Sequence, residues 1–453
     1  MNKSLWLTFI SLLFVSAVKA ETLSLEIAID KALMADPRIS EMQAFVRHAQ
    51  GLLAEAEGSD GIFVAANSFV GFSPGIDGGL FGDESCGVNK ECVSRDDRFD
   101  LKDGISPWLY LEYGIIKPLN SFGKIENFST AARHNIKVKE QDVRIQRGAT
   151  IYDVKRAYYG HLTAKNSRLF LEDVKKRINN AKDDIQDLLD EDEGKATQSD
   201  LYALQSASAL AQSYIVRAAA LEQVAINGLK VLTGYKLSDE LQLADKGIKP
   251  VELPTLDLLT LQKKAMTERP EITQLTHGLK ARRALIKAKQ SMKKPNVYAG
   301  VIGSFSYSPL RDRVDNPHIA DPFNDMGTTP VVGVQWQWAG AVQSAQTQQA
   351  RAELDALLEK NNFAQKGIPY QVLENFQQVN AKHDAVSEMR KSSKAARKWM
   401  VSSYSDFQAG VQEVDKLVTA FTAYVTTYAD YLQLVYDYNM QVAQLDQVTG
   451  AYQ

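Results

Sequence analysis

Residues 108–116 read Trp-Leu-Tyr-Leu-Glu-Tyr-Gly-Ile-Ile, and residues 331–338 read Val-Val-Gly-Val-Gln-Trp-Gln-Trp. In both stretches the kind of side chain changes at every second position. This two-residue period indicates a β-strand with two unlike faces. Each stretch is followed after a few residues by a glycine and a very long helical pattern. The two stretches therefore indicate a chain of two similar halves, each with strands next to long helices.

A second predicted strand precedes each of these stretches and forms a hairpin with it. Residues 61–73 end in Phe72-Ser73-Pro74, and residues 297–308 end in Tyr307-Ser308-Pro309. A loop rich in Gly, Asp and Pro follows in both halves and is longer in the first, where it covers residues 75–107. Each half therefore contains one hairpin.

Beyond each hairpin we predict a long helix and a returning helix. Their ranges are 121–190 and 197–232 in the first half, and 341–404 and 412–447 in the second. A helix of about 70 residues rises roughly 100 Å, several times the thickness of a bilayer. Gly194 and Gly410 mark the turns, because glycine readily takes the positive φ that ends a helix.

The returning helix of the first half carries two apolar stripes. One has a spacing of three and four residues and contains Leu201, Leu204, Ala211, Ile215, Ala218, Ala225, Leu229 and Leu232. The other lies on a different face and contains Leu210, Tyr214, Leu221 and Val224. Two stripes on one helix predict neighbours on two sides, as in a closed ring of helices or a multi-helix bundle.

The helices before the hairpins complete the repeat. Residues 25–56 include Asp36-Pro37-Arg38-Ile39, and residues 259–289 include Arg269-Pro270-Glu271-Ile272. We assign residues 21–234 to the first repeat, 235–254 to a linker without a strong period, and 255–453 to the second repeat. The predicted fold class is mostly α, with four β-strands and long antiparallel helices.

The N-terminus has the features of an export signal. Lys3 precedes the apolar run Leu5–Val15, and Val18-Lys19-Ala20 is a small-residue cleavage site, so the mature chain is expected to begin at Glu21. In an exported protein, Cys86 and Cys92 are expected to form a disulfide. Such a disulfide would fix a loop and would not hold the fold together.

No later apolar stretch has the length of a membrane-spanning helix. Membrane strands must have every backbone group paired, so a barrel has to close. Four strands are too few for this, since the smallest single-chain barrels have about eight. If the hairpins enter a bilayer, several chains must share one barrel. Taken alone, the strands equally fit half-buried hairpins of a soluble protein.

The sequence gives no support for an enzyme or a nucleic-acid-binding protein. The net charge is −3 with both signs interspersed, so no basic face is expected to bind nucleic acid. There is no nucleotide-binding loop and no HExxH zinc motif. The histidines are scattered, and His161 is expected to be a packing residue in a helix. We therefore expect no catalytic site, metal site or cofactor.

The order of elements resembles that of the TolC-type outer-membrane efflux and export family across essentially the whole mature chain. The local motifs that carry the resemblance are Leu23-Ser24-Leu25-Glu26-Ile27-Ala28-Ile29 with the Asp36-Pro37 step, Lys117-Pro118-Leu119 before Phe122-Gly123-Lys124, and Gly194-Lys195-Ala196-Thr197 with Asp200-Leu201. The resemblance implies a homotrimer in the cell outer membrane, with a twelve-stranded transmembrane β-barrel and an α-helical barrel that crosses the periplasm.

The same resemblance implies a passive exit duct of an efflux or type I secretion system. Such a duct docks onto an inner-membrane transporter, usually through a periplasmic adaptor, and its barrel contacts outer-membrane lipid. The alternative is a periplasmic structural or adaptor protein built from helical hairpins. Aromatic residues expected at the membrane interface are Trp108, Tyr110, Trp336 and Trp338.

The resemblance places the periplasmic tip at the two helical turns. Candidate contacts to an adaptor are Gly194, Thr197 and Gly410. Candidate acidic residues of the pore entrance are Asp187, Asp190, Glu191, Asp192, Glu193, Asp200, Asp406 and Asp415. The chain departs from the family after the second turn, where known members have constricting acidic residues and this chain has Lys416 and Thr419.

Overall fold

The computed structural model describes residues 22–76, 99, 101–191, 196–313 and 321–451. The predicted signal peptide, the pair Cys86 and Cys92, and the residues Asp192, Glu193 and Gly194 lie outside this range. The chain forms two compact units. The helical unit contains Met1–Gln43, Gln141–Ile272 and Phe363–Gln453, and the sheet unit contains Ala44–Glu140 and Thr273–Asn362.

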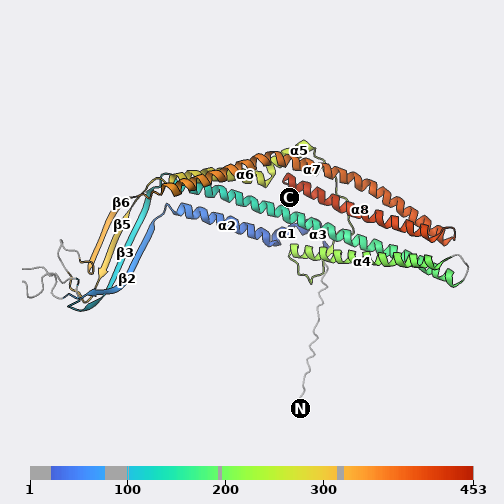
Figure 1. The fold of residues 1–453 in the computed structure, drawn as a ribbon, viewed down its shortest axis with the longest axis horizontal. Coiled ribbons are helices and arrows are strands. Elements are labelled where there is room, and N and C mark those ends of the chain that lie inside the picture. The colour runs from blue at the N-terminus through green and yellow to red at the C-terminus, as the bar shows by residue number, and fades with distance from the viewer. Residues whose placement is uncertain (1–21, 77–98, 100, 192–195, 314–320, 452–453) are drawn as a thin grey trace, which may run out of the picture. The chain divides into compact units, whose positions relative to one another are not determined.

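The chain is mostly helical with few strands, as the sequence predicted, and its elements occur twice in the same order (Figure 1). The first set is α1 (Leu25–Ala35), α2 (Pro37–Gly58), β2 (Phe63–Pro74), β3 (Ile105–Asn120), α3 (Lys124–Asp190) and α4 (Gln198–Thr233). The second is α5 (Leu258–Glu268), α6 (Pro270–Ser291), β5 (Asn296–Tyr307), β6 (Asp325–Gln335), α7 (Gly340–Gln408) and α8 (Val414–Thr449). Three pairs of equivalent helices have equal lengths: α1 and α5 have 11 residues, α2 and α6 have 22, and α4 and α8 have 36, while α3 and α7 have 67 and 69.

A proline separates the first two helices of each set. The residue before a proline is disfavoured in the α region, and Asp36 accordingly has an extended conformation with ψ 113°. Arg38 Nη2 lies 2.8 Å from Asp36 Oδ2, and Arg269 Nη2 lies 2.9 Å from Glu271 Oε1. Both breaks therefore carry an ion pair across the proline, with the charges exchanged between the halves.

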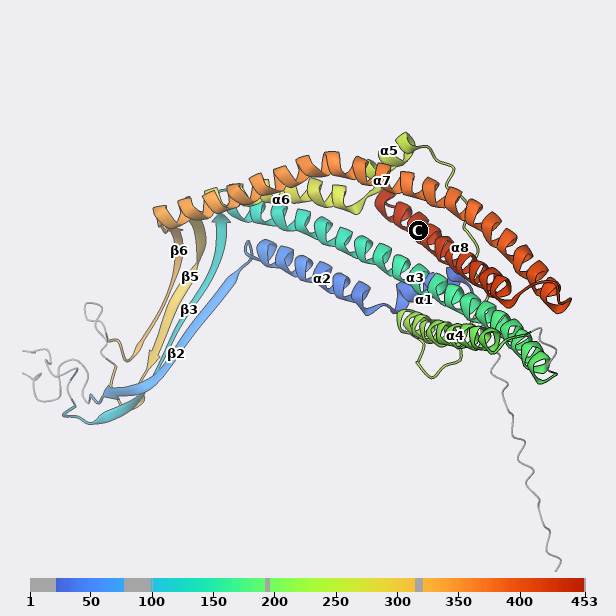
Figure 2. The same ribbon diagram turned by 45° about the vertical axis from the view of Figure 1, so that its right-hand side comes forward.

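The core of the helical unit comes from heptad stripes on its long helices. On α7 the buried residues Val372, Val379, Val386, Met400 and Phe407 recur at multiples of seven, the period of a coiled-coil seam. Part of this seam packs with residues of α3, α4 and α8 in one hydrophobic cluster. Figure 2 shows α4 beside α3 and α8 beside α7 in this unit.

The segment predicted as a linker is tied to the helical unit. Within it β4 (Gln242–Leu243) pairs in parallel with β1 (Thr22–Leu23). Buried Asn439 of α8 donates to the Lys249 carbonyl over 2.8 Å and accepts from the Val251 N–H over 2.9 Å. Because one amide satisfies two backbone groups, the linker follows a fixed path.

Glycines cap α4 and α8 where these helices meet the proline breaks. Gly234 and Gly450 have φ values of 79° and 80°. A Cβ on Gly450 would lie 2.9 Å from the Arg269 backbone nitrogen, closer than real contacts allow. Glycine is thus required both by the left-handed conformation and by the close approach of two chain segments.

The sheet unit holds an antiparallel sheet in the order β2-β3-β5-β6. β2 and β5 overlap the predicted ranges closely. β3 begins before and ends beyond the predicted range 108–116, and β6 begins at Asp325 instead of residue 331 and ends before Trp336. Pro330 lies inside β6, one residue before the predicted start of this strand. An edge strand tolerates proline because one side of its backbone has no partner.

None of the helices in the described part of the chain combines the length and apolar composition needed to cross a membrane.

Candidate functional site

The sheet has one apolar face and one face, here called the polar face, that carries most of the polar residues and glycines. Directly paired residues of antiparallel strands share a face, so the register assigns every position. The pairs Val70–Leu109 and Leu109–Tyr307 belong to one face, and Glu112–Ser304 and Ser304–Gly327 to the other. The apolar face contains Val64, Val70, Phe72, Leu109, Leu111, Ile115, Val301, Phe305, Met326, Val332 and Val334. The polar face contains Asn67, Gly71, Glu112, Gly114, Gly300, Ser304, Gly327, Thr329, Gly333 and Gln335, and also the apolar residues Phe63, Phe69, Ile116, Ile302 and Val331.

The apolar face is open to the surroundings in the single chain. Val70 is 82% exposed, Phe72 78% and Val332 77%. A contiguous apolar surface of this kind marks contact with a protein or a membrane. Exposure of this face to water is unfavourable, because burial of apolar surface stabilises a protein by about 25 cal/mol per Å².

Both outer strands leave one backbone edge unpaired in the described sheet. β2 pairs only with β3, and β6 pairs only with β5. Long edges of this kind are templates for pairing with another strand. Each chain therefore offers two complementary edges.

The predicted interface aromatics occupy two ends of the sheet. Trp108 Nε1 donates to Ser306 Oγ over 2.7 Å, and Tyr110 stacks on Phe69 with ring centroids 6.0 Å apart. Both lie on the polar face, near the end that carries the loops. Trp336 and Trp338 follow β6 at the opposite end, where Trp336 Nε1 donates to the Lys293 carbonyl over 3.1 Å.

A buried polar cluster that the sequence did not reveal closes the loop end of the sheet. Arg311 and Asp321 form an ion pair of 3.1 Å with side chains only 1% and 3% exposed. The guanidinium also donates to the Pro74 carbonyl over 3.0 Å and lies 4.9 Å from the Phe323 ring. Beside it, hydroxyls of Ser73, Ser308 and Ser106 are linked by hydrogen bonds of 2.7 Å.

The first helical turn is fixed at its start by a capping box. The Asp200 N–H donates to Thr197 Oγ1 over 3.3 Å, and the Thr197 N–H donates to Asp200 Oδ2 over 2.9 Å. These bonds satisfy backbone groups at the start of α4. Thr197 and Asp200 thus have a structural role, whereas Asp187, Asp190 and Glu191 are exposed.

The second turn ends α7 with a Schellman motif. Gly410 has a φ of 71°, its N–H bonds to the Phe407 carbonyl, and the Val411 N–H bonds to the Asp406 carbonyl. Val411 is 81% exposed. The side chains of Asp406, Asp415, Lys416 and Thr419 are also exposed. In the described part of the two turns, none of these acidic residues forms an ion pair with a basic residue.

The two predicted stripes of α4 have different surroundings. In the first, Leu201, Leu204 and Leu229 are buried. In the second, Leu210 is 56% exposed, Leu221 63% and Val224 68%. The chain therefore covers one side of α4 and leaves the other side available.

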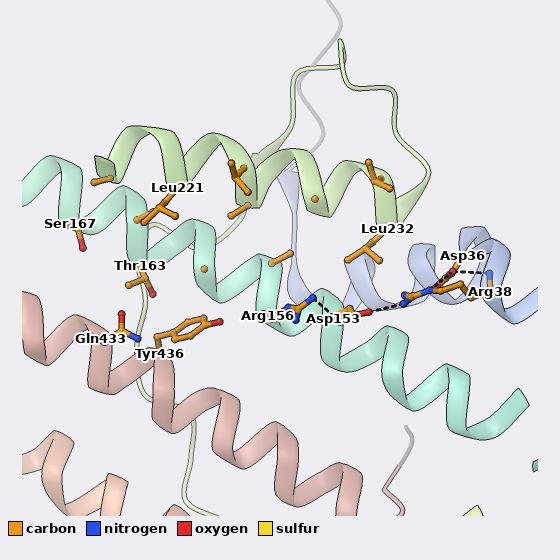
Figure 3. Close-up of a pocket in the computed structure, with 18 of the residues that line it drawn as sticks. Asp36, Arg38, Asp153, Arg156, Thr163, Ser167, Leu221, Leu232, Gln433 and Tyr436 are labelled. Carbon is orange, nitrogen blue, oxygen red and sulfur yellow. Dashed lines mark hydrogen bonds and ion pairs between the residues drawn. The ribbon is translucent and has the colours of Figure 1, made fainter. Parts of the chain in front are cut away.

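The exposed stripe borders a groove of about 920 Å³ among α3, α4 and α8 (Figure 3). Small residues form much of its lining: Ala157, Gly160, Ala164, Ala225 and Gly228. Figure 3 shows Leu221 and Leu232 on α4, and Gln433 and Tyr436 on α8. A groove with small residues can accept large side chains of another helix, as holes accept knobs in a coiled coil.

An ion-pair network bounds one end of this groove. Arg38 contacts Asp36 and also Asp153, at 2.8 and 3.0 Å. Burial raises the pKa of Asp36, but hydrogen bonds from Arg38 and Thr150 outweigh burial and hold the pKa below its usual value. Asp36 is therefore ionised at neutral pH.

His161 is 9% exposed, and its Nδ1 lies 3.2 Å from the Glu222 carbonyl oxygen. Burial lowers the pKa of His161. The residue is a neutral histidine packed between helices, as the sequence indicated.

Comparison with known proteins shows similarity in structure. No protein-family model and no curated protein sequence matches the chain. The CmeC outer-membrane channel of Campylobacter jejuni aligns with a TM-score of 0.75 at 11% identity, over 94% of this chain and 85% of that one.

Two further outer-membrane proteins align with slightly lower TM-scores. The outer-membrane protein VceC of Vibrio cholerae gives a TM-score of 0.72 at 13% identity, over 94% of this chain and 96% of that one. The open state of the MtrE outer-membrane channel of Neisseria gonorrhoeae gives 0.72 at 15% identity, over 94% and 88%. The chain thus has the fold of the TolC-type outer-membrane channels, as its sequence motifs predicted.

Proposed function

We propose that this protein is a passive exit duct of the outer membrane, which carries substrate from an inner-membrane transporter across the periplasm and the outer membrane in an efflux or type I secretion system. The observation that carries the proposal is the two-faced sheet with two unpaired edges. An apolar outer face and a polar inner face are the pattern of a membrane barrel that encloses water.

Closure of this barrel needs more than one chain. Inside a bilayer the unpaired edges of β2 and β6 would leave backbone groups without partners, each at a cost of several kcal/mol. Pairing β2 of one copy with β6 of the next removes these edges. With three copies the barrel has twelve strands, so we infer a homotrimer, in agreement with the fold it shares with these channels.

The helical unit supports the same assembly. The exposed stripe of α4 and the adjoining groove provide a surface for a helix of the neighbouring copy. A closed ring of helices would bury this surface and enclose a channel. Trp336 and Trp338 would then lie at one membrane interface, whereas Trp108 and Tyr110, on the polar face, would line the lumen.

The two helical turns would contact the partner proteins of the duct. We infer that they contact a periplasmic adaptor or the transporter, through Gly194, Thr197, Gly410 and the exposed Val411. The acidic residues at the first turn would favour cations at the entrance. The signal at residues 1–20 would direct export and be removed after Ala20. In this proposal the protein is not an enzyme and needs no cofactor.

Cross-linking of the two sheet edges tests the barrel. Ala66→Cys on β2 is combined in turn with Met326→Cys, Thr328→Cys or Val332→Cys on β6, in a chain whose Cys86 and Cys92 are replaced by serine. All four positions lie on the same face of the sheet. Since one register closes the barrel, one pair is expected to form disulfides between copies and give covalent dimers and trimers on denaturing gels.

The control is each single-cysteine variant, which is expected to give no trimer. Cell fractionation accompanies the test, with the protein expected in the outer membrane. Release with the soluble periplasm, together with absence of cross-links for all three pairs, would instead support a periplasmic helical-hairpin protein.

A further inference from the structure

Two histidines from distant parts of the sequence meet in the sheet unit. His134 lies on α3 and His277 on α6, and their Nδ1 atoms are 3.0 Å apart. The ring centroids are 5.2 Å apart, with an angle of 43° between the planes. Both side chains are half-buried. The nitrogens are therefore directed at one another across a helix–helix contact.

The same two helices make further contacts, among them Lys289 Nζ of α6 at 6.0 Å from the Phe128 ring centroid of α3. Gln274 of α6 donates to the Val138 carbonyl of α3 over 3.5 Å, one turn along both helices. His134 and His277 thus belong to a defined packing contact between the first and second repeats.

The surroundings of His134 disfavour its charged form. Burial lowers the pKa of His134, and His277 and Lys280 lower it further. A neutral imidazole has one nitrogen with a free lone pair. When one ring carries its proton on Nδ1 and the other ring does not, the two nitrogens share a hydrogen bond. A metal ion can take the place of this proton.

The spacing suits a cation. Zinc binds histidine nitrogen at about 2.0–2.1 Å, and two ligands of one tetrahedral ion are then about 3.4 Å apart. The observed 3.0 Å reaches this value through small rotations of the two half-buried rings. No cluster of three or more His, Cys, Asp or Glu residues suited to a metal occurs in the described part of the chain, so water would complete the coordination.

We propose that His134 and His277 form a two-histidine binding site for a divalent transition-metal ion such as Zn²⁺, which joins α3 to α6. The site is exchangeable, because two protein ligands bind more weakly than four and the charge of Lys280 opposes a cation. It is independent of the proposed duct function, since it needs only the contact between two helices of one chain.

The test is a zinc titration of the purified full-length protein in detergent, with a competing chromophoric chelator. Wild type is expected to bind about one more Zn²⁺ per chain than His134→Asn or His277→Asn, and each variant is expected to lose at least about tenfold in affinity at this site. Binding is expected to fall below about pH 6, because protonation of imidazole removes the lone pair.

The matched control is His383→Asn. His383 is also on a long helix but lies beside Asp384 and the Tyr438 ring, and it contacts no other histidine in the described part of the chain. This variant is expected to bind as wild type does. Equal loss in all three variants would overturn the proposal, and so would equal binding by wild type and His277→Asn.

Zinc-edge absorption spectroscopy of the wild type keeps the test valid if a variant fails to fold. Two imidazole ligands with oxygen are expected. A shell with sulfur, or with fewer than two imidazoles, would show that the histidines share only a hydrogen bond.

Discussion

At the scale of single residues, the ion pair of Arg311 and Asp321 stabilises the loop end of the sheet. Both side chains are almost fully buried. Removing one partner of such a pair leaves an uncompensated buried charge, which costs about 3–5 kcal/mol. We expect Arg311→Met to lower the free energy of unfolding by this amount, measured as a lower urea midpoint of the folded protein.

The double variant Arg311→Met with Asp321→Leu is expected to recover most of this stability, because it leaves no buried charge. Arg133→Met is the control for an ordinary ion pair. Arg133 and Glu57 are 59% and 48% exposed, so this variant is expected to cost less than about 1 kcal/mol. A similar loss of unfolding free energy for Arg311→Met and Arg133→Met would contradict the stabilising role given to the buried ion pair.

Residue-scale contacts were the part of the structure that the sequence predicted least. His134 and His277 are 143 positions apart, so their spacing shows no motif, and the histidines were interpreted as scattered. Asp200 is predicted at the pore entrance, and the sequence did not reveal that its carboxylate also caps α4. The serine and arginine contacts at the loop end depend on loops whose path no local pattern specifies.

Elements were predicted better, because periodicity reports burial. The two stripes of α4 follow from the helical period, but only the structure shows that the chain buries one and exposes the other. The late start predicted for β6 has a similar cause. A pattern cannot tell an edge strand, which tolerates Pro330, from a central strand.

The exposed stripe of α4 makes a testable prediction about assembly. Leu221→Asp changes a residue that is 63% exposed in the single chain, so we expect little effect on the fold of the monomer. In the assembled ring the carboxylate would be buried against a neighbouring helix at a cost of several kcal/mol. Unheated gel electrophoresis and light scattering are expected to show loss of trimers.

Gln223→Asp is the matched control, because Gln223 is exposed on the same helix but lies outside the stripe. This variant is expected to remain trimeric. Trimers of normal stability with Leu221→Asp would show that this face of α4 is not an interface between copies.

At the scale of the whole molecule, the repeat is the feature that the sequence carried most clearly. Helices of equal length occur in the same order in both halves. The ion pairs at Asp36-Pro37-Arg38 and Arg269-Pro270-Glu271 have exchanged charges, so the repeat preserves the interaction and not the residues. The pattern of prolines, glycines and apolar spacing therefore predicted the architecture, although the sequences of the halves differ.

Two adjacent valines of β6 test whether the sheet lies in a bilayer. Val332 pairs with Ala299 on the apolar face, and Val331 pairs with Gly300 on the polar face. A lysine on the lipid-facing side of a membrane barrel costs about 2–4 kcal/mol near the midplane, whereas a lysine in the lumen meets water. We expect Val332→Lys to reduce the amount of folded trimer in the outer membrane, and Val331→Lys to retain it. Because the two variants differ only in the face that carries the charge, equal recovery would argue against lipid on the apolar face, and the opposite order would reverse the assignment of inside and outside.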